Sequence, residues 1–189
     1  MAGRFAEIAF TPGVKNEQLI NGSRRGYARL EQGEAEPGSL GAHEAAFIAG
    51  RDSFYMATVS ETGWPYIQHR GGPEGFVRII DSKTIGFADF AGNRQYISVG
   101  NLRANDRVSL FFMDYPNHTR LKLLGRVRLI DGDDAALLGQ LHVPDYHGRV
   151  ERGMIITVEG FDWNCPQHIT PRFTRSEIMS IMKPSLGPF

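Results

Sequence analysis

A cation and several hydrogen-bonding side chains lie in residues 87–102, FADFAGNRQYISVGNL, where a predicted strand turns into a predicted helix. Arg94 can donate two parallel hydrogen bonds to an anion, and a helix N-terminus adds unpaired backbone N–H groups and a partial positive charge. In a helix that begins near Asn93, Ser98 and Asn101 share a face with Arg94. The stretch therefore indicates a phosphate-binding site, unless Asn93 only caps the helix and Arg94 is only solvated.

Two predicted strands carry polar side chains on one face. In the run PYIQHR, Gln68 and Arg70 lie on one face and His69 on the other, and the two glycines that follow let a ligand approach the backbone. In the run RLKLLGRVRLI, Arg120 and Lys122 share a face. Each pair indicates an anion-binding strand, and the alternative for each is a polar face exposed to solvent.

An aromatic ring and several amides lie in the run EGFDWNCPQHITPRF near the C-terminus. Trp163, Asn164 and Gln167 offer a flat ring with hydrogen-bonding groups beside it, which suits a flat heterocycle with polar edges. The alternative is a loop that packs Trp163 into the core. His168 and Cys165 are too few for a zinc site, which needs about four ligands, so we expect no metal.

Short apolar runs separated by turn residues predict the elements that must position these side chains. Strands are expected at residues 53–60, 65–70, 75–81, 83–89, 107–115, 120–130 and 153–162, and helices within 11–23 and at 43–49, 93–106, 133–142 and 174–182. Because strands outnumber helices and follow one another through tight turns, we predict an α+β fold on a closed or nearly closed antiparallel β-barrel. We expect an N-terminal arm, residues 1–40, packed on a single domain, residues 41–189.

The charge balance argues against a protein that binds nucleic acid through bulk electrostatics, because 21 basic and 21 acidic residues give a net charge of zero. The single cysteine, Cys165, excludes an intramolecular disulfide and is typical of a reducing cytoplasm. The sequence shows no signal peptide and no apolar run near the roughly 18 residues of a membrane span. We therefore expect a cytoplasmic protein that contacts neither nucleic acid nor a membrane.

Four runs, taken in order, carry a resemblance to a known family: GWPYIQHRGGP, TIGFADFAGNRQYISVGNLRANDRVSLFF, TRLKLLGRVRLI and DWNCPQH. From about Ser53 to Pro171 the chain resembles the FMN-binding split-barrel superfamily, in its pyridoxamine 5′-phosphate oxidase-like branch. The resemblance implies an antiparallel, Greek-key-like split β-barrel with peripheral helices. It also implies a homodimer that binds FMN at the subunit interface.

The resemblance also implies which residues bind the cofactor. Arg94 and Gln95 stand where the oxidases bind the FMN phosphate with an Arg-Lys pair, and Arg120 stands where a glutamine reaches in from the partner subunit. The full predicted set is Gln68, His69, Arg70, Ala88, Asp89, Asn93, Arg94, Gln95, Ser98, Asn101, Arg120, Lys122, Trp163, Asn164 and Gln167. No catalytic residue is assigned.

Two departures bear on the expected activity. Gln95 replaces the lysine, and the C-terminal IMKPSLGPF lacks the Arg-Leu-x-Pro segment with which true oxidases grip the substrate phosphate. The resemblance therefore favours an FMN-dependent oxidoreductase that acts on an unidentified small organic substrate. The alternatives are a non-catalytic flavin store or sensor, a true pyridoxamine-phosphate oxidase, and a deazaflavin-dependent reductase on the same barrel.

Overall fold

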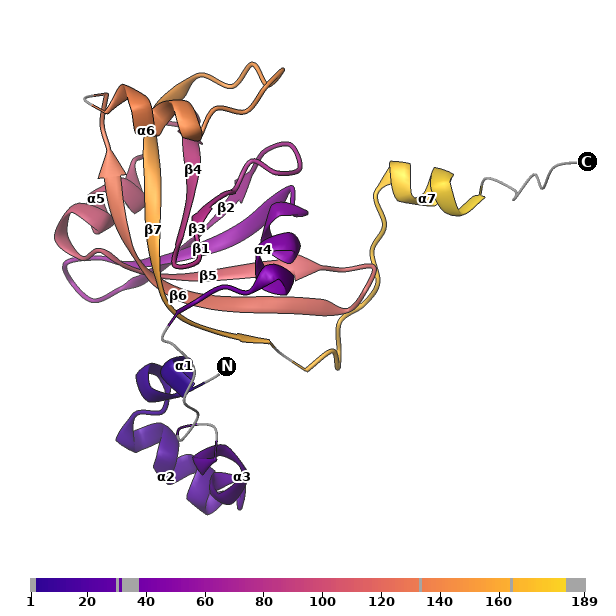
Figure 1. The fold of residues 1–189 in the computed structure, drawn as a ribbon. Helices are drawn as coiled ribbons and strands as arrows, with labels where there is room; N and C mark the ends of the chain where they lie inside the picture. Colours follow the sequence, from indigo (N-terminus) through magenta and orange to yellow (C-terminus); the bar gives the residue numbers. More distant parts are fainter. Residues whose placement is uncertain (1–2, 30, 32–37, 133, 164, 183–189) are drawn as a thin grey trace, which may run out of the picture.

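The computed structural model describes residues 3–29, 31, 38–132, 134–163 and 165–182, and within them seven strands form one antiparallel sheet (Figure 1). The strands are β1 (Ser53–Val59), β2 (Pro65–Gly71), β3 (Arg78–Asp81), β4 (Thr84–Phe90), β5 (Arg107–Asp114), β6 (Thr119–Ile130) and β7 (Val150–Trp163). Their order across the sheet is β2-β1-β5-β6-β7-β4-β3, and each neighbouring pair is antiparallel. Each predicted strand run corresponds to one of these strands.

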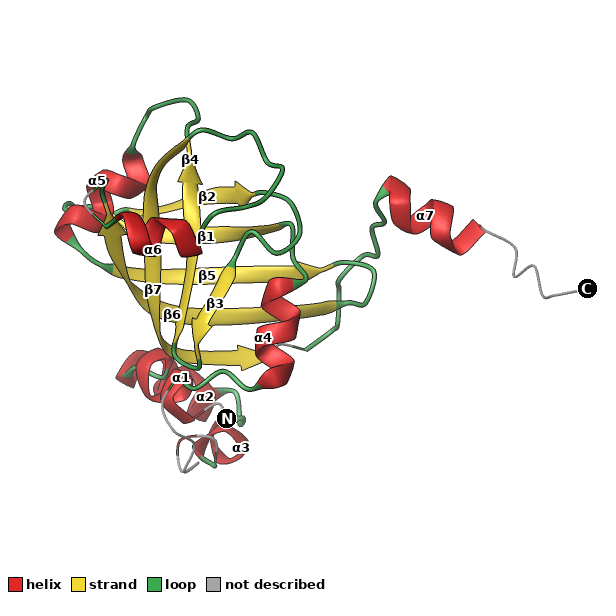
Figure 2. Ribbon diagram, turned by 45° about the horizontal axis from the view of Figure 1, so that its top comes forward, coloured by secondary structure: helices red, strands yellow, loops and turns green. Residues whose placement is uncertain are grey.

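The sheet curls so that strands far apart in its order share one core (Figures 1 and 2). The rings of Phe54 on β1 and Phe87 on β4 lie 5.2 Å apart between centroids, although β5, β6 and β7 separate the two strands in the sheet. Phe76 and Phe112 also pack on Phe54, at 5.8 and 4.9 Å. The α+β class is confirmed, whereas a closed or split barrel and a homodimer stay predictions.

Strand β4 is buried on both faces, because each residue from Ile85 to Asp89 is buried. Phe87 packs in the main core. On the opposite face, helix α6 (Ala135–Gln140) covers a second small cluster. The buried members of that cluster are Ala88, Ile130, Leu141 and Ile155. The pairing of β4 with β7 then shifts at a β-bulge between Asp89 and Phe90, where β4 ends.

Most predicted helices form close to their expected positions. Helix α2 (Pro12–Ile20) ends at Asn21, and helix α4 (Ala42–Ala49) ends at Gly50. Helix α7 (Arg175–Met182) begins with the expected capping box, because the Glu177 N–H donates to Thr174 Oγ1 at 3.2 Å and the Thr174 N–H donates to Glu177 Oε2 at 2.6 Å. Helix α5 (Ile97–Ala104) starts four residues after Asn93, so the predicted start near Asn93 is wrong.

The N-terminal segment forms two further helices that were not predicted, α1 (Gly3–Ala9) and α3 (Arg24–Ala28). Helix α1 packs against β7 at Gly160, where an added Cβ would lie 2.8 Å from the backbone nitrogen of Phe5. Helix α7 lies apart from the sheet at the other side of the molecule (Figures 1 and 2). The division into an arm and a single domain stays a prediction. Within the described ranges, no helix is both long enough and apolar enough to cross a membrane.

Candidate functional site

Arg94 lies in an irregular loop, residues 91–96, and not on a helix. Arg94 and Tyr96 have left-handed backbone torsions, with φ of 60° and 54°, which residues with side chains seldom adopt. Asn93 Oδ1 accepts a hydrogen bond from the Gln95 N–H at 3.2 Å, so Asn93 shapes the loop instead of capping α5. The N-cap is Tyr96, which makes no side-chain capping bond, so the first N–H groups of α5 can bind an anion.

Ser98 and Asn101 do not share a helical face with Arg94, because Arg94 precedes the helix. Both side chains are buried under α5. Ser98 Oγ donates to Gln68 Oε1 at 2.8 Å, which ties α5 to β2, and Asn101 Nδ2 donates to Thr58 Oγ1 at 2.9 Å, which ties α5 to β1. These bonds fix the position of α5 against the sheet.

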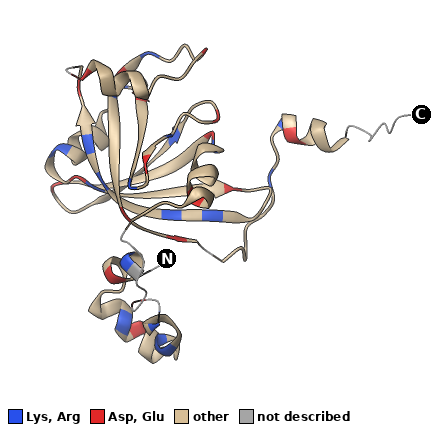
Figure 3. Ribbon diagram, viewed as in Figure 1, with Lys and Arg blue, Asp and Glu red and all other residues tan. Residues whose placement is uncertain are grey.

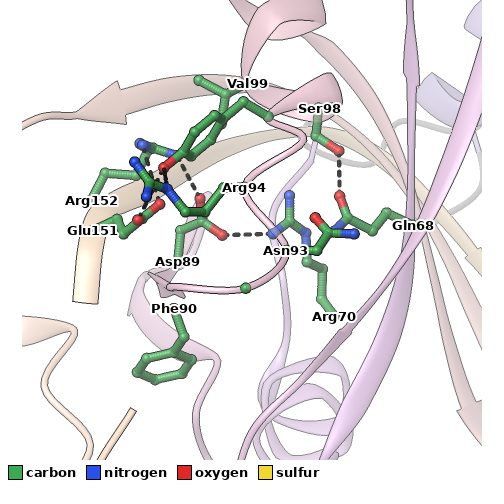
Figure 4. A pocket seen from close by; sticks show the side chains of 12 residues that line it. Gln68, Arg70, Asp89, Phe90, Asn93, Arg94, Ser98, Val99, Glu151 and Arg152 are labelled. Carbon is green, nitrogen blue, oxygen red and sulfur yellow. Dashed lines mark hydrogen bonds and ion pairs between the residues drawn. The ribbon is translucent and has the colours of Figure 1, made fainter. Parts of the chain in front are cut away.

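A cavity of about 210 Å³ lies between β2, the end of β4, the 91–96 loop and the start of β7 (Figure 4). The predicted cofactor-binding residues that line it are Gln68, Arg70, Asp89, Asn93, Arg94 and Ser98. Sequence reasoning missed its other lining residues, which are Phe90, Gly92, Tyr96, Val99, Glu151 and Arg152. The cavity thus brings together residues that are distant in the sequence. The first, Gln68, and the last, Arg152, are more than 80 residues apart.

An ion-paired triad, Arg70–Asp89–Arg152, lies on one wall of this cavity. Arg70 Nη1 lies 2.6 Å from Asp89 Oδ1, and Arg152 Nη1 lies 3.0 Å from Asp89 Oδ2. The three side chains are 12%, 7% and 14% exposed. Arg70 Nε is buried and has no hydrogen-bond partner among the described residues, which costs about 1–3 kcal/mol.

A second polar network, around Tyr96, lies in the same cavity. The Tyr96 hydroxyl accepts from Arg94 Nε at 3.4 Å and donates to Glu151 Oε1 at 3.1 Å. The Arg94 side chain is exposed, and the hydrogen bond with Tyr96 raises its already high pKa, so it stays protonated. Arg94 is therefore a permanent cation at the mouth of the cavity.

The cavity carries a local excess of positive charge. Its lining contains three arginines and two carboxylates, so its formal charge is +1. Elsewhere basic and acidic residues are interspersed over the strands and the N-terminal helices (Figure 3). The positive charge is therefore a feature of the site and not of the whole chain, whose net charge is zero.

A second cavity of about 150 Å³ adjoins the first and shares Gln68, Arg70, Asp89 and Phe90 with it. Phe76 and Phe87 form an aromatic part of its lining, and His69, Gly71 and Ala88 complete it. Of the predicted residues, His69 and Ala88 thus line the second cavity and not the first. The two cavities together place the charged side chains beside the edge of the phenylalanine core, where Phe76 and Phe87 are each 1% exposed.

The remaining predicted residues line neither cavity within this one chain. They are Gln95, Asn101, Arg120, Lys122, Trp163 and Gln167; Asn164 lies outside the described residues. Lys122 Nζ pairs with Asp162 at 2.9 Å, and the Arg120 guanidinium lies 6.0 Å from the Phe111 ring. Trp163 lies at the far end of β7 from Arg152, about 35 Å along an extended strand.

Trp163 is held by a buried carboxylate on α4. Its Nε1 donates to Glu44 Oε1 at 2.8 Å, and the Gly41 N–H donates to Glu44 Oε2 at 3.0 Å. Burial alone would raise the pKa of Glu44, but these bonds, together with nearby His43, hold that pKa below its ordinary value. Glu44 therefore stays ionised and anchors Trp163 to α4.

Arg152 is the most informative residue that sequence reasoning missed. Residues Val150–Trp163 form one strand, β7, but nothing in their composition reveals which strand pairs with them. In the structure, Arg152 lies directly opposite Asp89 in the β4–β7 register, which brings the two charges together. Only the strand pairing, and not the local sequence, could have identified it.

The sequence model of the pyridoxamine 5′-phosphate oxidase family matches residues 40–153, well over half of the chain. The chain therefore belongs to the pyridoxamine 5′-phosphate oxidase family. A search of curated proteins found no match.

Solved structures share the fold at low sequence identity. A protein described as a pyridoxamine 5′-phosphate oxidase of Lactobacillus delbrueckii superposes with a TM-score of 0.52 at 17% identity, covering 66% of this chain and 94% of that chain. HupZ from Group A Streptococcus superposes with a TM-score of 0.50 at 18% identity, covering 71% of this chain and 100% of that chain. These likenesses show the fold alone.

The residues present fit a flavin mononucleotide. Arg94 and the N–H groups at the start of α5 supply donors for a phosphate, and the Gln68 amide, which lines both cavities, can meet a polar ring edge. Phe76 and Phe87 supply apolar contact from the adjoining cavity. Each cavity alone is smaller than the ~300 Å³ at the lower end of ordinary ligand pockets, so a ligand of this size needs both.

Proposed function

We propose that the protein is an FMN-binding flavoprotein, and that it acts as an oxidoreductase on a small organic substrate. One observation carries the proposal: six of the predicted residues, from β2, β4, the 91–96 loop and α5, converge on one cavity of positive charge, which adjoins a second cavity lined in part by Phe76 and Phe87. Membership of the pyridoxamine 5′-phosphate oxidase family supports the choice of cofactor.

Each part of the site has a role in this proposal. Arg94 and the first N–H groups of α5 bind the phosphate, which carries about two negative charges near neutral pH. Gln68 and Arg70 bind polar edges of the ligand, and Phe87 excludes water beneath it. The flavin, when bound, supplies the electron chemistry, and the protein supplies orientation and electrostatics.

The proposal includes a homodimer whose flavin sites lie at the subunit interface. Its support is that Arg120, Lys122, Trp163 and Gln167 line neither cavity of their own chain. If these residues contact the cofactor as the family resemblance implies, a second copy must bring them. A cytoplasmic location also belongs to the proposal, and the single exposed cysteine is consistent with it.

Spectroscopy of the purified protein tests the proposal. We expect flavin absorption bands in the isolated protein, or quenching of FMN fluorescence on titration, with weaker binding of riboflavin because it lacks the phosphate. A protein that is colourless and binds neither compound would refute the proposal.

Reduction of the bound flavin distinguishes an oxidoreductase from a protein that only stores or carries flavin. Reduction by NADH or NADPH, followed by reoxidation with an electron acceptor, would support an oxidoreductase. Reduction by dithionite alone, with neither nucleotide effective, would favour the non-catalytic flavin carrier instead.

A further inference from the structure

Asp89 is a buried carboxylate whose two oxygens are both occupied by arginines. Oδ1 contacts Arg70 Nη1 at 2.6 Å, and Oδ2 contacts Arg152 Nη1 at 3.0 Å (Figure 4). The residue is only 6% exposed. Its side chain is therefore engaged within the protein, while Asp89 also lines both cavities and its predicted cofactor contact stays a prediction.

The two ion pairs join three strands at the boundary between the cavities. Arg152 and Asp89 lie opposite each other on the neighbouring strands β7 and β4. Arg70 lies on β2, which is at one end of the sheet order and is not paired with β4. The Arg70–Asp89 bond therefore bridges two strands that no backbone ladder holds together, and both residues line both cavities.

The two arginines differ in how strongly they depend on Asp89. Arg152 also faces Glu151 at 3.6 Å and Asp131 at 3.9 Å, and its guanidinium lies 5.3 Å from the Tyr96 ring. The structure pairs Arg70 with Asp89 and places its guanidinium 5.9 Å from the Phe87 ring. Loss of the Asp89 charge would thus remove the carboxylate partner described for Arg70, whereas Arg152 would keep Glu151 and Asp131 nearby.

We infer that Asp89 is a positioning and charge-setting residue: it orients Arg70 at the junction of the two cavities and holds the Arg70–Asp89–Arg152 triad at a charge of +1. This inference rests on the proposed binding of FMN. The triad attracts an anionic ligand, but less strongly than two unscreened arginines would. Two-electron reduction with uptake of one proton adds one negative charge to the bound flavin, so the triad charge sets how easily that reduction occurs.

The midpoint potential of bound FMN, measured by dithionite titration against a reference dye, tests the inference. In Asp89→Asn the triad charge becomes +2, and we expect the affinity for reduced FMN to rise about tenfold relative to oxidised FMN, which raises the potential by about 30 mV. In Arg152→Gln the charge becomes 0, and the potential should fall. Asp89→Glu, which keeps the charge, should stay close to the wild type.

The opposite signs distinguish a charge-setting role from a purely structural one. Loss of packing would change the potential of Asp89→Asn and Arg152→Gln in the same direction, and unchanged potentials in both would equally overturn the inference. If Asp89→Asn does not fold, Arg152→Gln is compared with Arg152→Lys, which keeps the charge: a fall in Arg152→Gln alone supports the charge-setting role, and an equal fall in both overturns it. Wild-type protein that binds no FMN would refute the proposed function, and this inference with it, before any variant is compared.

Discussion

Arg94 is the residue on which the proposed phosphate binding chiefly depends. It is exposed at the cavity mouth, and the one hydrogen bond described for its side chain goes to the neutral Tyr96 hydroxyl. Arg70 and Arg152 are both paired with Asp89. A ligand phosphate that approaches Arg94 therefore breaks no described ion pair of Arg94, although Glu151 attracts the guanidinium electrostatically.

Replacement of this side chain gives the first residue-scale prediction. Arg94→Ala should weaken FMN binding about 10- to 100-fold, the value of a charge-assisted hydrogen bond, and should leave riboflavin binding nearly unchanged. Fluorescence titration of both ligands measures this. The matched control is Arg103→Ala, which removes the same charge from the exposed last turn of α5, where Arg103 pairs with Asp131. Equal losses in the two variants would contradict a specific role for Arg94.

At the same scale, alternation predicted some side chains correctly and others not at all. Gln68 and Arg70 both line the first cavity, as the strand period of two required, and His69 does not line it, although all three residues line the second cavity. Arg94 was predicted on a helix, but the left-handed φ at Arg94 and Tyr96 delays the helix to Ile97. Propensity does not reveal such torsions, because surrounding contacts impose them.

At the scale of elements, the Glu44 carboxylate joins α4 to the end of β7. Its two oxygens accept from the Trp163 ring and from the Gly41 backbone, so it connects helix and strand while it also completes the cap of α4. Sequence reasoning predicted α4 and its end at Gly50. It left Trp163 open between ligand binding, which stays a prediction, and packing. The link between them depends on β7 passing beside α4, which only the folded sheet determines.

The pH dependence of stability tests this link. The folded-state pKa of Glu44 is held below its ordinary value of 4.5, so its stabilisation is complete above that pH and is lost as pH falls through the folded pKa. Glu44→Gln should lower the free energy of unfolding by about 1–3 kcal/mol at pH 7, with a smaller difference at acid pH. Glu61→Gln, in the exposed turn after β1, is the control. A difference that does not change with pH, measured by denaturant unfolding, would contradict the role of the charge.

At the scale of the molecule, the sheet order explains why the site could be predicted only in part. The hairpins β1–β2, β3–β4 and β5–β6 pair strands that follow each other in the sequence, and the turn residues between them predict these pairings. The pairings β1–β5 and β4–β7 bring together distant segments, and no local pattern specifies them. Arg152 and Glu151 reach the cavity through the second of these pairings, which is why they were missed.

A crystal structure of the protein with bound FMN is the most direct test of the central claim, that the 91–96 loop and β2 hold a flavin phosphate. We expect the phosphate within hydrogen-bond distance of Arg94 and of the first N–H groups of α5, with the ring toward Phe87 and a second copy of the chain covering it. FMN bound elsewhere, with Arg94 in bulk water, would show that this loop and β2 do not hold the phosphate.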